Sequence, residues 1–449
     1  MSAGPASLQE KVRLPSRLLA TLAAATLFAT SCSRQVPTAP AHSVAVTRLM
    51  GAAQGSWGQG AATEVMVTLA SGVDAADVAR DYGVTLVRRT AWGATFRPSG
   101  SETLDNIAAR MIDDSRVITA ESDQYVETAE SRQQSLAFDD GYGTPGNYAE
   151  QPATQSIGLD GALEVSQGAG ILVAILDTGA DLTHPALSGR VAPGGWDFVQ
   201  GDPDPTDDHD FLDNDGDGLV DEAWGHGTHV AGIVARTAPG ARLLIVRVLD
   251  ADGRGDLLNV ISGIHWAIDH GARVINMSLG MANPSDAMED VLAEAEQHGV
   301  VCVASAGNWG SNQPQDFPAT SSHVLAVAAI NAPDDVAAEF TSWGSFVSIS
   351  APGVVVRSAY PENRYWVWSG TSMSAPFVSG GAALLLSLHS EWDKNAVMSR
   401  LASGARSIRL ENQNMAKWTG LGAGALNLAG ALAPDSVPPD DGDGDLIRH

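Results

Sequence analysis

The stretch Gly370-Thr371-Ser372-Met373-Ser374-Ala375-Pro376 determines how the rest of the chain is interpreted. Ser372 lies between small residues, and the apolar run over residues 377–388 predicts a buried helix with Ser372 in its first turn. A serine hydroxyl is a weak nucleophile on its own. A catalytic Ser372 would therefore need a base, a group that orients the base and a donor for the developing oxyanion, all from other segments.

Three other segments carry residues of these types. The continuous apolar run 171–176 predicts a parallel strand buried on both faces, and Asp177 follows at its carboxyl end, where open α/β sheets place their sites. His226 stands between two glycines that allow close approach, whereas His229 is expected to be structural. Asn308 follows the apolar run 300–304, and its amide can donate to an oxyanion. Taken singly, Asp177 could equally cap a turn and Asn308 could be a turn residue.

Taken together, the motifs resemble those of the subtilisin-like serine proteases. They are Asp177-Thr178-Gly179, Gly225-His226-Gly227-Thr228-His229, Ala306-Gly307-Asn308 and the stretch around Ser372, in the family's order of acid, base and nucleophile. The resemblance covers residues 155–433. It implies an α/β fold with a doubly wound, mainly parallel sheet, and an endopeptidase that acts on polypeptide substrates.

The resemblance also implies the catalytic roles. Ser372 would attack the scissile carbonyl, His226 would take its proton, and Asp177 would orient His226. Asn308 and the backbone N–H of Ser372 would form the oxyanion hole. The alternative is a catalytically silent envelope protein with the same fold that only binds, but such proteins usually lack a triad member, and all four residues are present here.

A substrate groove is implied between residues 249–255 and 274–280, where an extended peptide would pair with both segments. The expected substrate-binding residues are Ser278, Leu279, Gly280, Gly253, Gly255, Ala306, Gly307 and Asp316. If Asp316 lies at the floor of the first specificity pocket, a basic side chain is favoured before the cleaved bond. The alternative is an exposed loop aspartate.

An acidic insert precedes His226. Its carboxylates, with glycine at the sixth position, follow the start of an EF-hand-type calcium loop, but Trp224 stands where such a loop has its bidentate glutamate. Glu222 could substitute for it. The predicted ligands of a structural Ca²⁺ are Asp213, Asp215, Asp217, Leu219, Asp221 and Glu222, and the alternative is a solvated acidic loop.

A small α+β domain is predicted before the main one. Strands are expected at residues 64–69, 84–89, 94–97 and 117–126, and helices at 75–82 and 104–112, an order typical of ferredoxin-like domains. In the family such a domain is a propeptide that assists folding and inhibits the enzyme. The polar, Gly/Pro-rich residues 131–153 then predict a domain boundary with a processing site.

The N-terminus has the features of an export signal. Lys11, Arg13 and Arg17 precede an apolar run over residues 18–30, which is too short to span a bilayer. Ala29-Thr30-Ser31-Cys32 resembles a bacterial lipobox, so Cys32 is a candidate lipidation site for membrane anchoring. Ordinary signal-peptide cleavage and secretion is the alternative.

Composition limits the function classes. The formal net charge of the 449 residues is −27, which argues against nucleic-acid binding through a basic surface. With two cysteines, a disulfide framework is excluded, and Cys302 is expected to be a buried core residue. The predicted organisation is signal peptide 1–32, linker 33–60, propeptide 61–129, linker 130–153, catalytic domain 154–433 and acidic tail 434–449.

Overall fold

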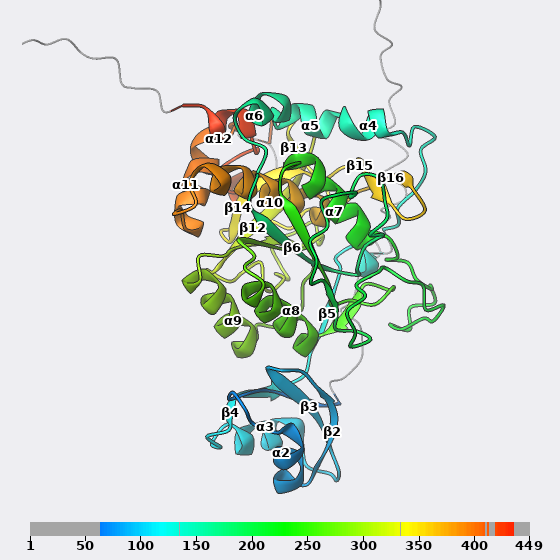
Figure 1. Cartoon of the computed structure of the whole chain (residues 1–449), viewed down its shortest axis with the longest axis vertical. Coiled ribbons are helices and arrows are strands. Elements are labelled where there is room, and N and C mark those ends of the chain that lie inside the picture. The colour runs from blue at the N-terminus through cyan, green and yellow to red at the C-terminus, as the bar shows by residue number, and fades with distance from the viewer. Residues whose placement is uncertain (1–62, 134, 333, 409–410, 413–417, 435–449) are drawn as a thin grey trace, which may run out of the picture. The chain divides into compact units, whose positions relative to one another are not determined.

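A computed structural model describes residues 63–133, 135–332, 334–408, 411–412 and 418–434 (Figure 1). The predicted signal peptide with Cys32, the linker 33–60 and the tail beyond residue 434 lie outside the described residues.

The first described unit is an antiparallel four-stranded sheet with two helices. Its strands are ordered β2-β3-β1-β4, and its elements follow the predicted order along the chain. Asp74 and Thr103 cap the two helices by accepting hydrogen bonds from backbone N–H groups of the first turn. The elements are β1 (Val65–Leu69), α2 (Ala75–Tyr82), β2 (Val84–Arg89), β3 (Gly93–Pro98), α3 (Leu104–Met111) and β4 (Val117–Ser122).

The last predicted strand of this unit, residues 117–126, is divided into two strands. The first part, β4, belongs to the four-stranded sheet, whereas β5 (Tyr125–Glu127) pairs antiparallel with β9 (Arg254–Asp256) far along the chain. The alternation of apolar residues predicts a strand but does not identify the sheet that it joins, so this division was not predicted.

The main sheet has the order β13-β12-β11-β10-β6-β8-β7, with β14 also paired to β12. All of its strand pairs are parallel except β12 with β13. Such a sheet is buried on both faces, which explains the continuous apolar runs. Its strands are β6 (Leu172–Asp177), β7 (Trp196–Asp197), β8 (Arg242–Arg247), β10 (Val274–Met277), β11 (Val301–Ser305), β12 (Val324–Asn331), β13 (Val336–Ala337) and β14 (Val347–Pro352).

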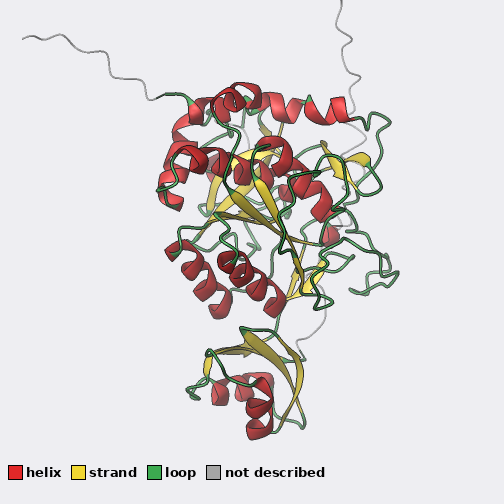
Figure 2. Cartoon of the chain, viewed as in Figure 1, coloured by secondary structure: helices red, strands yellow, loops and turns green. Residues whose placement is uncertain are grey.

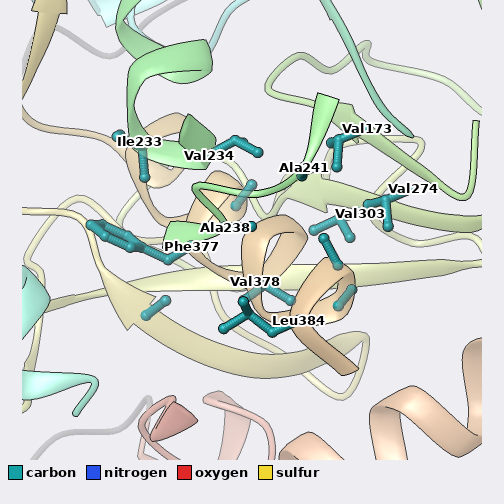
Figure 3. Packing of buried hydrophobic residues seen from close by; sticks show 14 of the residues in the cluster. Val173, Ile233, Val234, Ala238, Ala241, Val274, Val303, Phe377, Val378 and Leu384 are labelled. Atoms are coloured by element: carbon teal, nitrogen blue, oxygen red, sulfur yellow. The ribbon is translucent and has the colours of Figure 1, made fainter. Parts of the chain in front are cut away.

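Helices cover both faces of this sheet (Figure 2). Alternate residues of β6 enter different cores. Val173 and Ile175 pack with α7 and α10 (Figure 3). Ala174 and Leu176 pack on the other side with α8 and α9. The predicted α/β, doubly wound, mainly parallel architecture is confirmed. The helices are α4 (Pro145–Ala149), α5 (Pro152–Ser156), α6 (Leu159–Val165), α7 (His226–Thr237), α8 (Leu257–Asp269), α9 (Asp286–Gln297), α10 (Thr371–Leu388), α11 (Lys394–Gly404) and α12 (Leu428–Leu432). A hairpin of β15 (Val356–Tyr360) and β16 (Arg364–Trp368) precedes α10, and short 3₁₀ turns cover Ser131–Gln133 and Trp418–Gly420.

Helix α10 begins one residue before Ser372, as the sequence predicts. Within the described part of the chain it alone is long and apolar enough to cross a membrane, with a mean hydropathy of 1.3, but 89% of that window is buried inside the protein. It is therefore the central core helix of the catalytic fold.

Helix α7 approaches the β15–β16 hairpin closely at Gly232. A Cβ at this position would lie 2.9 Å from both the Cβ and the backbone nitrogen of Ala359, and closer still to the hydroxyl of Ser358. By contrast, a Cβ at Gly161 in α6 would lie 3.6 Å from the Cβ of Ala429, which is an ordinary contact. The two helical glycines therefore differ mainly in the space around them.

We expect Gly232→Ala to lower the free energy of unfolding by about 1–3 kcal/mol through overpacking. Gly161→Ala is the matched control and should raise it by about 0.5–1 kcal/mol, because alanine is the better helix former. Urea unfolding in a Ser372→Ala background, which prevents self-digestion, measures both. Equal effects of the two substitutions would contradict the close packing of α7 on the hairpin.

Candidate active site

Asp177 and His226 form a buried pair at the carboxyl end of β6. Oδ1 of Asp177 lies 2.7 Å from Nδ1 of His226 and also accepts the N–H of Thr178 at 2.8 Å. Both side chains are at most 1% exposed. The ring of Trp368 packs edge-on against the imidazole, with ring centroids 5.2 Å apart. The orientation of His226 is thus determined by a carboxylate on one side and an aromatic ring on another.

The glycines around His226 have distinct roles. Gly225, immediately before α7, has a φ of 89°, a left-handed conformation that favours glycine, and a Cβ there would lie 2.6 Å from the ring of Tyr360. At Gly227 a Cβ would collide with the carbonyl of Gly179. His229 points elsewhere: its Nε2 bonds to the carbonyl of Val356 at 3.1 Å, which agrees with a structural role.

Ser372 and Asn308 meet at the start of α10. Oδ1 of Asn308 accepts hydrogen bonds from the backbone N–H and the hydroxyl of Thr371, at 2.9 and 2.8 Å. These bonds determine which way the amide faces, so its Nδ2 donor points toward the Ser372 side of the loop. The hydroxyl of Ser372 is buried and lies 3.3 Å from the carbonyl of Ser278.

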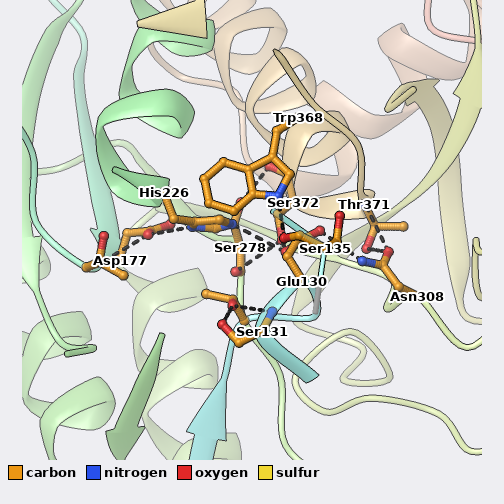
Figure 4. A network of polar contacts seen from close by, with 12 residues as sticks. Glu130, Ser131, Ser135, Asp177, His226, Ser278, Asn308, Trp368, Thr371 and Ser372 are labelled. Atoms are coloured by element: carbon orange, nitrogen blue, oxygen red, sulfur yellow. Dashed lines mark hydrogen bonds and ion pairs between the residues drawn. The ribbon is translucent and has the colours of Figure 1, made fainter. Parts of the chain in front are cut away.

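The carboxylate of Glu130 lies between these groups (Figure 4). Its Oε2 accepts the Ser372 hydroxyl at 2.5 Å and lies 3.3 Å from Nε2 of His226, while its Oε1 accepts Nδ2 of Asn308 at 2.9 Å. Glu130 therefore engages the Asn308 amide, the Ser372 hydroxyl and the His226 imidazole at once. It was missed by sequence reasoning, since it belongs to no motif, and its only signal is its place at the boundary of the two predicted domains.

Burial and neighbouring charges have opposite effects on the pKa values of His226 and Glu130. Burial works to lower the pKa of His226, but the charges and hydrogen bonds of Asp177 and Glu130 outweigh it and raise the pKa to about 10. Burial likewise works to raise the pKa of Glu130, but His226, Ser372 and Asn308 hold this pKa below its ordinary value. His226 is thus protonated and Glu130 ionised near neutral pH, and a protonated imidazole cannot act as a base.

A peptide segment of the chain itself lies in the predicted groove. Strand β5 pairs with β9 on one side, so that Val126 lies opposite Gly255, and on the other side Glu127 and Gly280 exchange backbone hydrogen bonds of 2.9 Å. The N–H of Thr128 then donates to the carbonyl of Gly253 at 2.9 Å. An extended peptide can therefore pair with both segments that the sequence indicated.

The remaining predicted groove residues lie around Ser372. The Ser278 hydroxyl donates to the carbonyl of Ser372 at 2.9 Å, and the Gly307 N–H donates to the Thr371 hydroxyl at 3.1 Å. Leu279 and Ala306 are buried in the core. Asp316 is 1% exposed and lies against Gly280 and Gly307, so it is not an exposed loop residue.

The acidic insert forms two overlapping groups of carboxylates. Asp213, Asp215 and Asp252 have ligand oxygens within 4.8 Å of one another, and so do Asp215, Asp217 and Glu222. Glu222 is 9% exposed, and neither of its oxygens accepts a hydrogen bond from the described residues. Burial and the charges of Asp252, Asp215 and Asp217 raise the pKa of Glu222 to about 9. Oxygen ligands that lack donors suit a hard divalent cation such as Ca²⁺.

One predicted calcium ligand, Asp221, has other partners, and the carboxylate groups include one residue, Asp252, that was not predicted. The carboxylate of Asp221 contacts the His209 ring at 3.0 Å and accepts backbone N–H groups of residues 210 and 211. The backbone N–H of Leu219 donates to Asp217 at 2.7 Å. The group of Leu219 that would bind calcium is therefore its backbone carbonyl. Asp252, 30 residues downstream of Glu222 in numbering, comes from the groove segment and had no sequence signal.

Together the fold and the arrangement around Ser372 define a subtilisin-like serine endopeptidase. Residues 168–424 match the subtilase family. The chain is 39% identical to thermitase of Thermoactinomyces vulgaris over 249 residues, which are 53% of this chain and 83% of that protein. It is 38% identical to subtilisin E of Bacillus subtilis over 250 residues, 61% of that protein. The chain belongs to the subtilase family.

Solved structures agree with this fold. Fervidolysin from Fervidobacterium pennivorans, described as a keratinolytic enzyme related to subtilisin, has a TM-score of 0.67 at 24% identity, over 84% of this chain and 61% of that chain. A protease from Pseudoalteromonas arctica has a TM-score of 0.55 at 29% identity, over 62% of this chain and 93% of that one.

The position of Glu130 predicts an unusual titration of His226. Because the pKa of His226 is raised, its protonated form stabilises the folded full-length chain fully below about pH 6.5, and this contribution is lost as the pH rises through about 10. In full-length Ser372→Ala protein, the imidazole protons observed by NMR should titrate near pH 10. Glu130→Gln in the same background should lower the midpoint.

Glu102→Gln is the control for that experiment, because it removes a carboxylate from an exposed ion pair with Arg110 and should leave the midpoint unchanged. A midpoint near 6.5 with Glu130 intact would contradict the contact between Glu130 and His226.

Proposed function

We propose that the chain is made as an inhibited precursor of an exported serine endopeptidase that uses Asp177, His226 and Ser372 as its triad. The observation that carries the proposal is the convergence of these three residues and Asn308 on one point, although they come from β6, α7, α10 and the loop after β11. No member of the constellation is missing, which disfavours a catalytically silent binding protein.

The chemistry follows from the geometry once Glu130 has left. Oγ of Ser372 bonds to the scissile carbonyl carbon and gives its proton to Nε2 of His226, while Asp177 stabilises the imidazolium. The carbonyl oxygen becomes an oxyanion that accepts from Nδ2 of Asn308 and the N–H of Ser372. His226 then gives the proton to the leaving amine, and water attack on the acyl-enzyme releases the second product and regenerates Ser372.

We infer that residues 61–129 are the inhibitory propeptide. Support comes from the backbone pairing of β5 in the groove and from the Glu130 carboxylate at Ser372 and Asn308. Two obstacles to catalysis then coincide: Nδ2 of Asn308 already donates to Glu130, and the base is protonated. Removal of this segment by a cut in the linker beyond Glu130 would free Nδ2 of Asn308 and return the pKa of His226 toward its ordinary range.

Export rests on the N-terminal pattern. If Cys32 is lipidated and the linker 130–153 is cut beyond Glu130, the anchor remains with the propeptide and the endopeptidase is held only by non-covalent contacts or released. If the signal is instead cleaved conventionally, both parts are secreted.

The acidic insert is proposed as a structural calcium site with Asp213, Asp215, Asp217, Glu222 and Asp252 as carboxylate ligands. A cation there would neutralise the carboxylates around Glu222 and order the loop that leads into α7 and His226, four residues after Glu222 in numbering. It would supply no step of peptide hydrolysis.

The function is tested by casein hydrolysis with the full-length wild type and Ser372→Ala. Wild type should shorten itself and hydrolyse casein, and a serine-directed inhibitor should stop both. Ser372→Ala should stay full length with kcat lowered about a million-fold. Ser399→Ala, an exposed serine of α11, is the matched control. Absence of hydrolysis after confirmed removal of the propeptide would favour the binding protein.

Calcium is tested by thermal unfolding of Ser372→Ala protein with and without chelator. A ligand present at 100 times its Kd stabilises by about 2.7 kcal/mol, so chelation should lower Tm by several degrees. Asp252→Asn should lower Tm and abolish the chelator effect, whereas Asp208→Asn, an exposed carboxylate of the same loop, should retain it. A Tm that is indifferent to chelator would exclude the site.

A further inference from the structure

A buried acidic pocket lies beside the oxyanion donors. Asp316 forms its floor: a Cβ built on Gly280 would lie 3.1 Å from the Cβ of Asp316, and one built on Gly307 would lie 2.5 Å from its Oδ2. The absence of side chains on these two walls leaves the carboxylate accessible from the groove. Its position is held by the Trp309 indole N–H, which donates to Oδ1 at 2.6 Å, and by the backbone pairing of Met281 with Phe317.

The precursor fills this pocket with an arginine of its own. The guanidinium of Arg132 contacts both oxygens of Asp316, at 2.8 and 3.4 Å, and its carbon lies 5.2 Å from the centre of the Trp309 ring. The Arg132 and Asp316 side chains are only 3% and 2% exposed. A planar guanidinium can contact both oxygens of a carboxylate and lie over an aromatic ring at the same time. This combination of contacts distinguishes arginine from lysine.

The pocket lies on the side of the residue that precedes the cleaved bond. Gly280 pairs with Glu127, and the chain runs from there toward Ser372 at Glu130. In a bound peptide, the residues that precede the cleaved bond therefore lie beside Gly280. The pocket walled by Gly280 and Gly307 receives the side chain of the residue immediately before that bond. Arg132 reaches the same pocket from beyond Glu130, through the 3₁₀ turn Ser131–Gln133.

We propose that this endopeptidase cleaves after arginine, with Asp316 and Trp309 as its specificity determinants and Arg132 as the precursor's stand-in for the substrate side chain. The assignment rests on the proposed function and names its substrate class. An apolar side chain in this pocket would leave a buried carboxylate without its counter-charge, which is strongly unfavourable. Lysine would supply the charge, but it has neither the second hydrogen bond to the carboxylate nor the planar guanidinium that lies over Trp309.

The test uses peptides that differ only in the residue before the cleaved bond, with the processed enzyme titrated by a fluorophosphonate. We expect kcat/KM after arginine to exceed that after phenylalanine by at least about 100-fold, with lysine in between. Asp316→Asn should lower the arginine value about 100-fold and leave the phenylalanine value unchanged or higher, which also reports that the variant is folded. Trp309→Leu should reduce the preference for arginine over lysine.

Asp269→Asn, which removes one exposed charge at the end of α8, is the control and should change none of these ratios. Equal or apolar-favoured cleavage by a fully labelled enzyme would overturn the arginine assignment while leaving the proposed function intact. Failure of the fluorophosphonate to label Ser372 in processed protein would overturn the proposed function itself.

Discussion

Parallel pairing of β6, β10 and β11 is the constraint on which the site depends. Because neighbouring parallel strands end at the same edge of the sheet, Asp177 at the end of β6 and the loop with Asn308 after β11 lie on one side, with β10 between them. The two central helices, α7 and α10, begin at that edge, so His226 and Ser372 are presented by first turns rather than by flexible loops. Precision at the site therefore derives from strand register and from the packing of the two helices on one face.

In the full-length chain, Glu130 supplies the negative charge and the hydrogen-bond acceptors for the buried polar groups at this edge. Asp177, His226 and Ser372 are buried, and Asn308 directs a donor into the same space. A carboxylate placed there satisfies the Asn308 donor, the Ser372 hydroxyl and a protonated His226 together. The arrangement resembles the charge distribution that develops during peptide hydrolysis, with negative charge near Asn308 and positive charge on His226. Glu130 thus matches the polar groups that the proposed mechanism would use.

Much of the fold and the residues that meet around Ser372 could be predicted from sequence because their signals are local. A continuous apolar run identified β6, small residues around Ser372 identified the first turn of α10, and flanking glycines selected His226 over His229. The strands of the small unit were predicted with nearly the observed bounds. The roles of Glu130 and Asp252 and the separation of β5 from β4 were not predicted. Each depends on contact with a segment that is distant in sequence, and the periodicity of apolar residues does not identify such contacts. Asp316 is intermediate: its location was proposed from resemblance, but the arginine that contacts it was not.

Strand β5 and Arg132 lie on opposite sides of Glu130 along the chain, and both are attached to the catalytic fold. While the chain is continuous, Glu130 is an intramolecular ligand whose effective concentration at Ser372 is set by the short connections around it, and dilution of the protein does not release it. A cut beyond Arg132 converts the same contacts into those of a dissociable complex. Its occupancy then depends on the total concentration of protein, so the endopeptidase would become more active as it spreads away from where it was made.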